Sequence, residues 1–181
     1  MLKLSRNEML DRWLLLTREE PLRADCRVTR SFGIDLEALA TMEMRMWYVD
    51  LLCHGPLEWV PLSEMAREAE VEVSPEGSLT ITLPDDCMRP VSVELHGWER
   101  PARIVLPGSR EAVMQTNPFA CGGVSRPVAV LRNGGRVLEI HSSPARPADA
   151  RIRSLICVAD PGDDSYVFHE DALSTIKPLI R

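Results

Sequence analysis

The sequence predicts an α+β fold in which a pair of helices precedes an antiparallel sheet of short strands and a last helix closes the chain. Apolar residues recur at helical spacing in the first third, and after Pro56 they alternate with polar residues in short runs separated by turns. Helices first and strands second favour an antiparallel sheet over a wound parallel one. We expect a single domain over 1–181, with a helical part over 1–56, a β part over 57–168 and a terminal helix over 169–181.

Two amphipathic helices are expected in the helical part. The first begins at a capping box, residues 5–8, in which a Ser hydroxyl and a Glu carboxylate satisfy amides of the first turn, and Pro21 ends it. The second has Asp35 as its N-cap and runs to His54, because the Gly-Pro pair that follows stops a helix. The apolar face of this second helix is predicted from its spacing: Leu36, Leu39, Met42, Met46 and Val49.

Two hairpins are predicted in the β part. Residues 70–83 alternate around a Ser-Pro-Glu-Gly turn, and residues 128–140 do so around Asn-Gly-Gly, which favours the positive φ of a primed turn. Four further elements are expected: a strand over 91–95, its partner over 103–106, one or two helical turns over 109–115, and a strand over 151–158. The terminal helix is expected over 171–180, perturbed by Pro178.

Composition excludes several classes of function. The net charge is −6, which disfavours nonspecific binding to nucleic acid, and all basic residues except Lys3 and Lys177 are arginine, which suits protein interfaces. The five cysteines form no CxxC pair, as expected in a reducing compartment. We find no signal-peptide pattern and no apolar run of about 20 residues, so we expect a soluble, cytoplasmic protein that does not bind membranes.

No metal or cofactor site is predicted. His54, His96, His141 and His169 match no metal-ligand spacing, and the chain has none of the glycine loops that bind nucleotides. The carboxylates of Asp160–Asp164 are concentrated as calcium ligands would be, but they lack the EF-hand spacing, so a solvated acidic turn is the better interpretation.

Two arrangements could support catalysis, and each has a structural alternative. Cys121 could act as a nucleophile with His141 as its base, but the two glycines after Cys121 also suit a simple bend before the next strand. Asp85 and Asp86 could form an acid/base pair, but adjacent residues of an extended chain point to opposite faces. A turn is therefore favoured there.

One surface for protein contact is suggested by Trp98, which follows a His-Gly turn and is close in sequence to Arg100 and Arg103. Tryptophan and arginine are enriched where proteins bind each other. The alternative, which we favour for Trp98, is that the ring belongs to the core.

The segment Leu83-Pro84-Asp85-Asp86-Cys87-Met88-Arg89-Pro90-Val91-Ser92-Val93 resembles the LPxDxxRxxxV step of phage head-to-tail adaptor proteins, the tail tubular protein A group. In that family a helical part precedes a small β domain and a helix closes the chain, which is the order expected here. The resemblance implies a protein without an active site that forms a ring between portal and tail, in a virion.

The sequence therefore leaves three functions open. The first is a non-enzymatic structural or assembly protein, an adaptor-like subunit of a phage or prophage that forms a homo-oligomer and contacts portal and tail proteins. The second is a module that binds a peptide at a sheet edge, for which the 128–140 hairpin is the expected place. The third is an enzyme of unfamiliar type that uses Cys121 and His141.

Overall fold

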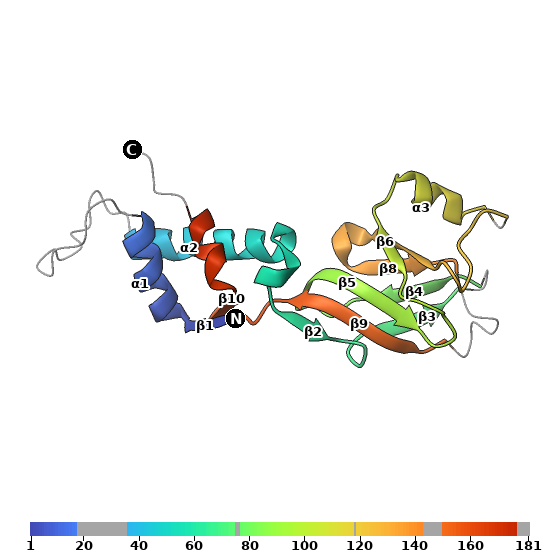
Figure 1. Ribbon diagram of the computed structural model, residues 1–181, viewed down its shortest axis with the longest axis horizontal. Coiled ribbons are helices and arrows are strands. Elements are labelled where there is room, and N and C mark those ends of the chain that lie inside the picture. The colour runs from blue at the N-terminus through green and yellow to red at the C-terminus, as the bar shows by residue number, and fades with distance from the viewer. Residues whose placement is uncertain (18–35, 75–76, 118, 143–149, 177–181) are drawn as a thin grey trace, which may run out of the picture. The chain divides into compact units, whose positions relative to one another are not determined.

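The structure, a computed structural model, describes residues 1–17, 36–74, 77–117, 119–142 and 150–176. It confirms the α+β class (Figure 1). Contacts divide the chain into two compact units. We call Met1–Pro61 with Asp160–Arg181 the helical unit, and Leu62–Ala159 the β unit. Residues from Asp160 onward thus belong to the helical unit, whereas the sequence analysis predicted that residues up to 168 belong to the β part.

In its described residues the helical unit contains two α-helices and a two-stranded antiparallel sheet. The elements are β1 (Leu2–Ser5), α1 (Arg6–Thr17), α2 (Leu36–His54), a 3₁₀ turn (Leu57–Trp59), β10 (Ser165–Phe168) and a second 3₁₀ helix (Glu170–Thr175). The predicted capping box of α1 is confirmed: the Ser5 hydroxyl donates to the Glu8 carboxylate at 2.7 Å, and the Ser5 amide does so at 2.8 Å. The predicted N-cap Asp35 and the stop at Pro21 lie outside the described residues.

The short strands β1 and β10 were not predicted, because four-residue strands that pair across the whole length of the chain leave no local pattern. Their pairing explains why the C-terminal segment belongs to the helical unit. Tyr48 of α2 completes this sheet: its hydroxyl donates to the Val167 carbonyl at 3.1 Å and accepts from the Val167 amide at 3.0 Å. A side chain of the helix thereby satisfies the open edge of β10.

The terminal helix predicted over 171–180 differs from the structure in type and length. The described part is a 3₁₀ helix that His169 caps, its ring Nδ1 accepting from the Asp171 amide at 3.3 Å. This helix ends at Thr175, because Ile176 already adopts an extended backbone. Residues 177–181 lie outside the described part.

The β unit contains two sheets (Figure 1), and side chains from both form its main apolar core. The first sheet has the strand order β2-β9-β5, and the second β3-β4-β8-β7-β6. The strands are β2 (Leu62–Glu64), β3 (Glu70–Val73), β4 (Leu79–Thr82), β5 (Cys87–Leu95), β6 (Arg103–Val105), β7 (Val128–Arg132), β8 (Val137–Ile140) and β9 (Ile152–Ala159). A short helix, α3 (Arg110–Gln115), packs near β7.

Both predicted hairpins are present. β3 pairs with β4, and β7 pairs with β8 around a turn in which Asn133 and Gly134 have φ of 48° and 64°. The expected strand over 151–158 is confirmed as β9, and the expected helical turns at 109–115 as α3.

The predicted pairing of strand 91–95 with 103–106 is wrong. β5 pairs with β9, and β6 runs parallel to β7. After Leu95 the chain turns so that Trp98 enters the core, and only Ala102 bridges back to Val93. The next amide, that of Arg103, already donates to the Pro127 carbonyl beside β7.

Candidate functional site

The acidic loop of Asp160–Asp164 is held by an arginine. The Arg45 guanidinium forms an ion pair with Asp160 and a second one with Asp163 at 3.1 Å, while the Gly162 amide donates to Asp160 at 3.0 Å. These carboxylates therefore anchor α2 to the start of β10. The loop is not simply the solvated turn that we expected, because two of its carboxylates pair with a cation.

The four histidines do not meet. His54 lies 2.9 Å from Asp50 one helical turn earlier, His141 lies 3.0 Å from Glu139, and His169 caps a 3₁₀ helix. Within the described ranges, no group of three histidine, cysteine or acidic side chains could hold a metal ion.

Cys121 and His141 lie on separate segments of the β unit. Cys121 follows α3, and its amide donates to the Asn117 carbonyl at 2.8 Å. His141 follows β8, where its Nε2 is engaged by Glu139, which also accepts from Arg132 at 2.8 Å. A Cys121 thiol would therefore have to reach Nδ1 for the pair to act as nucleophile and base.

The glycine after Cys121 has a structural reason. A Cβ at Gly122 would lie 2.3 Å from the Arg126 carbonyl oxygen, so only glycine allows this close approach of two backbone segments. This agrees with the bend that the sequence favoured.

Asp85 and Asp86 form a turn. Both side chains are exposed, and the Cys87 amide closes the turn on the Pro84 carbonyl at 3.1 Å. Arg136 donates to the Asp85 carbonyl oxygen at 2.8 Å, so this arginine ties the turn to the end of the 128–140 hairpin.

Trp98 is only 5% exposed, and its indole N–H donates to the Ser142 carbonyl at 2.8 Å. The core interpretation is confirmed, and the proposed contact role of Trp98 is corrected: a ring enclosed in this way is not presented to a partner. Arg100 and Arg103 are exposed, and Arg103 lies 3.2 Å from Glu111 of α3.

The 128–140 hairpin is not the open edge that peptide binding would need. β8 pairs with β4 and β7 pairs with β6, so both outer sides of the hairpin are already occupied. The ends of this sheet are β3 and β6. The expected place is wrong because the pairing of a hairpin with further strands depends on the rest of the fold.

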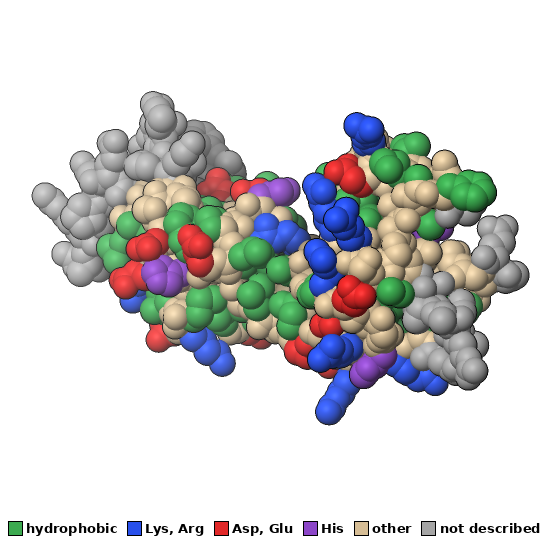
Figure 2. Space-filling view, turned by 45° about the vertical axis from the view of Figure 1, so that its right-hand side comes forward, with side chains coloured by type: hydrophobic (Ala, Val, Ile, Leu, Met, Phe, Trp, Pro, Cys, Tyr) green, Lys and Arg blue, Asp and Glu red, His purple; other side chains and the backbone are tan. Residues whose placement is uncertain are grey.

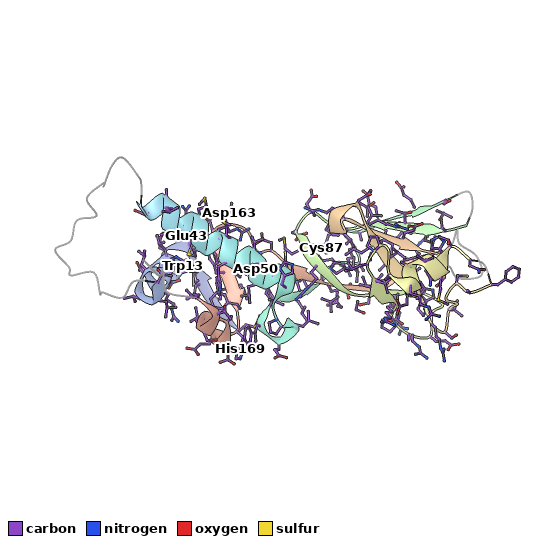
Figure 3. All side chains as sticks on the ribbon, turned by 90° about the horizontal axis from the view of Figure 1, so that it is seen from above. Trp13, Glu43, Asp50, Cys87, Asp163 and His169 are labelled. Atoms are coloured by element: carbon purple, nitrogen blue, oxygen red, sulfur yellow. The ribbon has the colours of Figure 1, made fainter. Side chains whose placement is uncertain are left out.

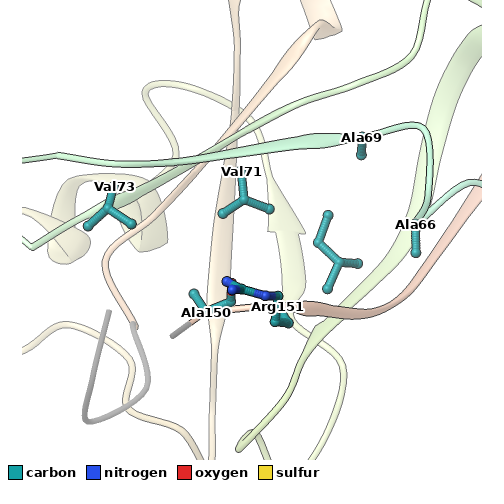
Figure 4. A pocket seen from close by; sticks show the side chains of 7 residues that line it. Ala66, Ala69, Val71, Val73, Ala150 and Arg151 are labelled. Atoms are coloured by element: carbon teal, nitrogen blue, oxygen red, sulfur yellow. The ribbon is translucent and has the colours of Figure 1, made fainter. Parts of the chain in front are cut away.

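A shallow groove of about 260 Å³ lies beside the edge strand β3 (Figure 4). Small apolar side chains line it, with one arginine: Ala66, Ala69, Val71, Val73, Ala150, Arg151 and Ile152. The Ser74 amide donates to the Ser78 carbonyl at 2.8 Å, so this pair belongs to the hydrogen-bonded set, and the alternation of an antiparallel pair leaves the N–H and C=O groups of Val71 and Val73 pointing away from β4. This edge could accept another strand.

Helix α2 has two apolar faces on opposite sides. One face is buried in the helical unit: Ala40, Met44, Tyr48, Leu51 and Leu52. The other carries Leu39, Met42 and Met46, which are 40%, 53% and 64% exposed, and continues with the half-buried Val49 and Cys53. We call these five outward residues the α2 seam. At about 100° per residue the seam lies roughly opposite the buried face.

The exposure of the α2 seam shows that the packed face predicted for this helix is wrong. Leu39, Met42, Met46 and Val49 were expected to form its packed face, whereas the unit buries the opposite side. The seam follows strict alternating steps of three and four residues, which is the spacing by which one helix packs along another. The sequence contains this spacing, but it also contains a second apolar face on the same helix, which was not predicted.

No protein-family model matches the chain, and no curated protein matches its sequence. Within the part of the chain that the structure describes, the helices are too short or too polar to cross a bilayer.

Proposed function

We propose that this chain is a non-enzymatic assembly protein, an adaptor-like subunit that associates with further copies of itself to form a ring, as phage head-to-tail adaptors do. The observation that carries the proposal is the α2 seam. The resemblance of Leu83–Val93 to the adaptor family and the order of helical and β segments point the same way.

The physical argument concerns the exposed apolar surface. A helix of a small soluble unit normally has one apolar and one polar side, and a helix that is apolar on both sides is normally covered on both. Fully burying a Leu or Met side chain contributes about 1.5–3 kcal/mol, so the seam would contribute several kcal/mol to an association. Hydrophobic side chains reach the surface of both units (Figure 2).

The proposal is tested by the molar mass of the purified chain, measured by light scattering and sedimentation velocity over a wide range of concentration. We expect the mass to rise with concentration toward a closed oligomer. A chain that stays monomeric at the highest concentration would contradict self-assembly.

The β3 groove supports a second function, the binding of an extended peptide. The N–H and C=O groups of Val71 and Val73 that point away from β4 would hold its backbone, and Arg151 at the groove would attract a carboxylate. Short Val/Ala-rich peptides with a C-terminal carboxylate should bind more tightly than their C-terminal amides, and Arg151→Ala should remove that difference. Equal or undetectable binding of both would count against this function.

A further inference from the structure

A second exposed apolar surface lies on α3 of the β unit. Ser109 caps this helix by accepting from the Ala112 amide at 3.2 Å, and the helix buries Ala112 and Gln115. Residues Arg110, Val113 and Met114, spaced i, i+3 and i+4, therefore share its outward side. Val113 is 63% and Met114 40% exposed. We call these three residues the α3 patch.

The α2 seam and the α3 patch carry opposite charges. Glu43 lies beside the seam, four residues after Leu39 and three before Met46. Asp50, seven residues later, lies on the same side by the helical repeat, and Figure 3 labels both residues along α2. Arg110 lies within the α3 patch. Among the described residues, neither Glu43 nor Arg110 has an ion-pair partner, so neither charge is paired within that part of the chain.

Pairing of two α2 seams explains these charges less well. In an antiparallel pair the acidic sides of the two helices, with Glu43 and Asp50, would face each other and repel. In a parallel pair the acidic side would meet the opposite side, which carries Arg45. That guanidinium is already held by Asp160 and Asp163.

We propose that the α2 seam of one copy binds the α3 patch of a second copy, with Glu43 of the first facing Arg110 of the second. This inference rests on the proposed function and names the surfaces that it uses. Because the two surfaces differ, the contact is heterologous: the first copy keeps its patch and the second its seam unoccupied, so copies add head to tail until a ring closes. Specific interfaces usually have apolar residues at the centre and complementary charges at the rim, and the proposed contact has both.

The test uses two full-length variants that each lose one surface. The seam variant is Met42→Glu with Met46→Glu, and the patch variant is Arg110→Glu with Val113→Glu. All four positions are exposed, so circular dichroism melts should match those of the wild type. Leu15→Glu, at an exposed position of α1, is the matched control and should assemble like the wild type.

Sedimentation velocity then separates the outcomes. Each variant alone should be monomeric, whereas an equimolar mixture should form a 1:1 dimer, since one variant retains the patch and the other the seam. If both variants assemble like the wild type, this interface is wrong and the assembly function stands. If the wild type itself is monomeric, both proposals fail.

A charge exchange tests the pair directly. Glu43→Arg and Arg110→Glu should each weaken association by about tenfold, because like charges then meet at the contact, and the double variant should recover most of the affinity. Additive losses in the double variant would overturn the pairing of Glu43 with Arg110.

Discussion

The β unit and the helical unit differ in how completely they bury their apolar residues. The two sheets of the β unit place a continuous set of apolar side chains between them, and residues such as Leu79, Leu138 and Leu155 are fully buried. In the helical unit α2 uses one apolar face for the core and leaves the other at the surface. The difference shows that burial within a unit accounts for only half of the apolar pattern of α2.

The largest expected effect separates the two faces of α2. Met44→Ala should lower the free energy of unfolding by about 2–5 kcal/mol, because it opens a cavity at a fully buried position. Met46→Ala, two residues away, should change it by less than about 0.5 kcal/mol in dilute solution. Urea denaturation of both variants measures the contrast, and equal losses would mean that α2 has no outward face.

Tyr48→Phe tests how α2 supports the sheet of the helical unit. Removing the hydroxyl leaves the N–H and C=O groups of Val167 without their partner, which should cost about 1–3 kcal/mol. Thermal denaturation of the variant checks this, with Tyr166→Phe as the aromatic control. No loss in Tyr48→Phe would show that water satisfies that edge equally well.

The same hydroxyl predicts a dependence on alkaline pH. Burial raises the pKa of Tyr48 to about 12, against about 10 for an unfolded tyrosine. A raised pKa in the folded state gives stability that is complete below pH ~10 and is lost as the pH rises toward ~12. The stability of Tyr48→Phe should therefore fall less steeply over this range than that of the wild type. Parallel curves would contradict the raised pKa.

A smaller effect is expected in the β unit, at Glu64 of β2. Burial would raise the pKa of this carboxyl, but hydrogen bonds from the Leu155 amide, the Ser154 hydroxyl and the Ala66 amide lower it. Glu64→Gln should cost about 1 kcal/mol at neutral pH. Because a lowered pKa gives stability that is lost as the carboxyl protonates, the difference between the variant and the wild type should shrink as the pH falls below about 4.3, the ordinary pKa of a glutamate. A difference that stays constant with pH would exclude this role of the carboxylate.

Local patterns predicted the elements whose signals are local. The capping box at Ser5, the primed turn at Asn133 and the end of α2 at His54 each depend on neighbouring residues, and all are present. Pairing between distant segments was not predictable in this way. β10 joins β1, and β6 joins β7 in parallel, because of contacts that no short stretch of sequence encodes.

For the candidate site, too, the sequence could predict only in part which residues come together and which are buried. Composition pointed to protein contact, and the one contact residue suggested beside the arginines, Trp98, lies in the core, which was the favoured alternative. The spacing of Leu39, Met42 and Met46 was recognised as apolar, yet the sequence could not show which of two apolar faces the unit buries. Arg110, Val113 and Met114 could not be predicted as a contact surface, because three exposed residues on a short helix form no sequence motif.

The central claim, that the outward face of α2 is covered by another copy, is tested most directly by oxidation of methionines with hydrogen peroxide, followed by mass spectrometry at low and high protein concentration. Met42 and Met46 should oxidise rapidly in dilute solution and become protected, together with Met114, when the protein is concentrated. Met44 should stay protected throughout, and the exposed Met1 should stay reactive throughout. If Met42 and Met46 oxidise at the same rate at every concentration, the outward face of α2 is not an interface between copies.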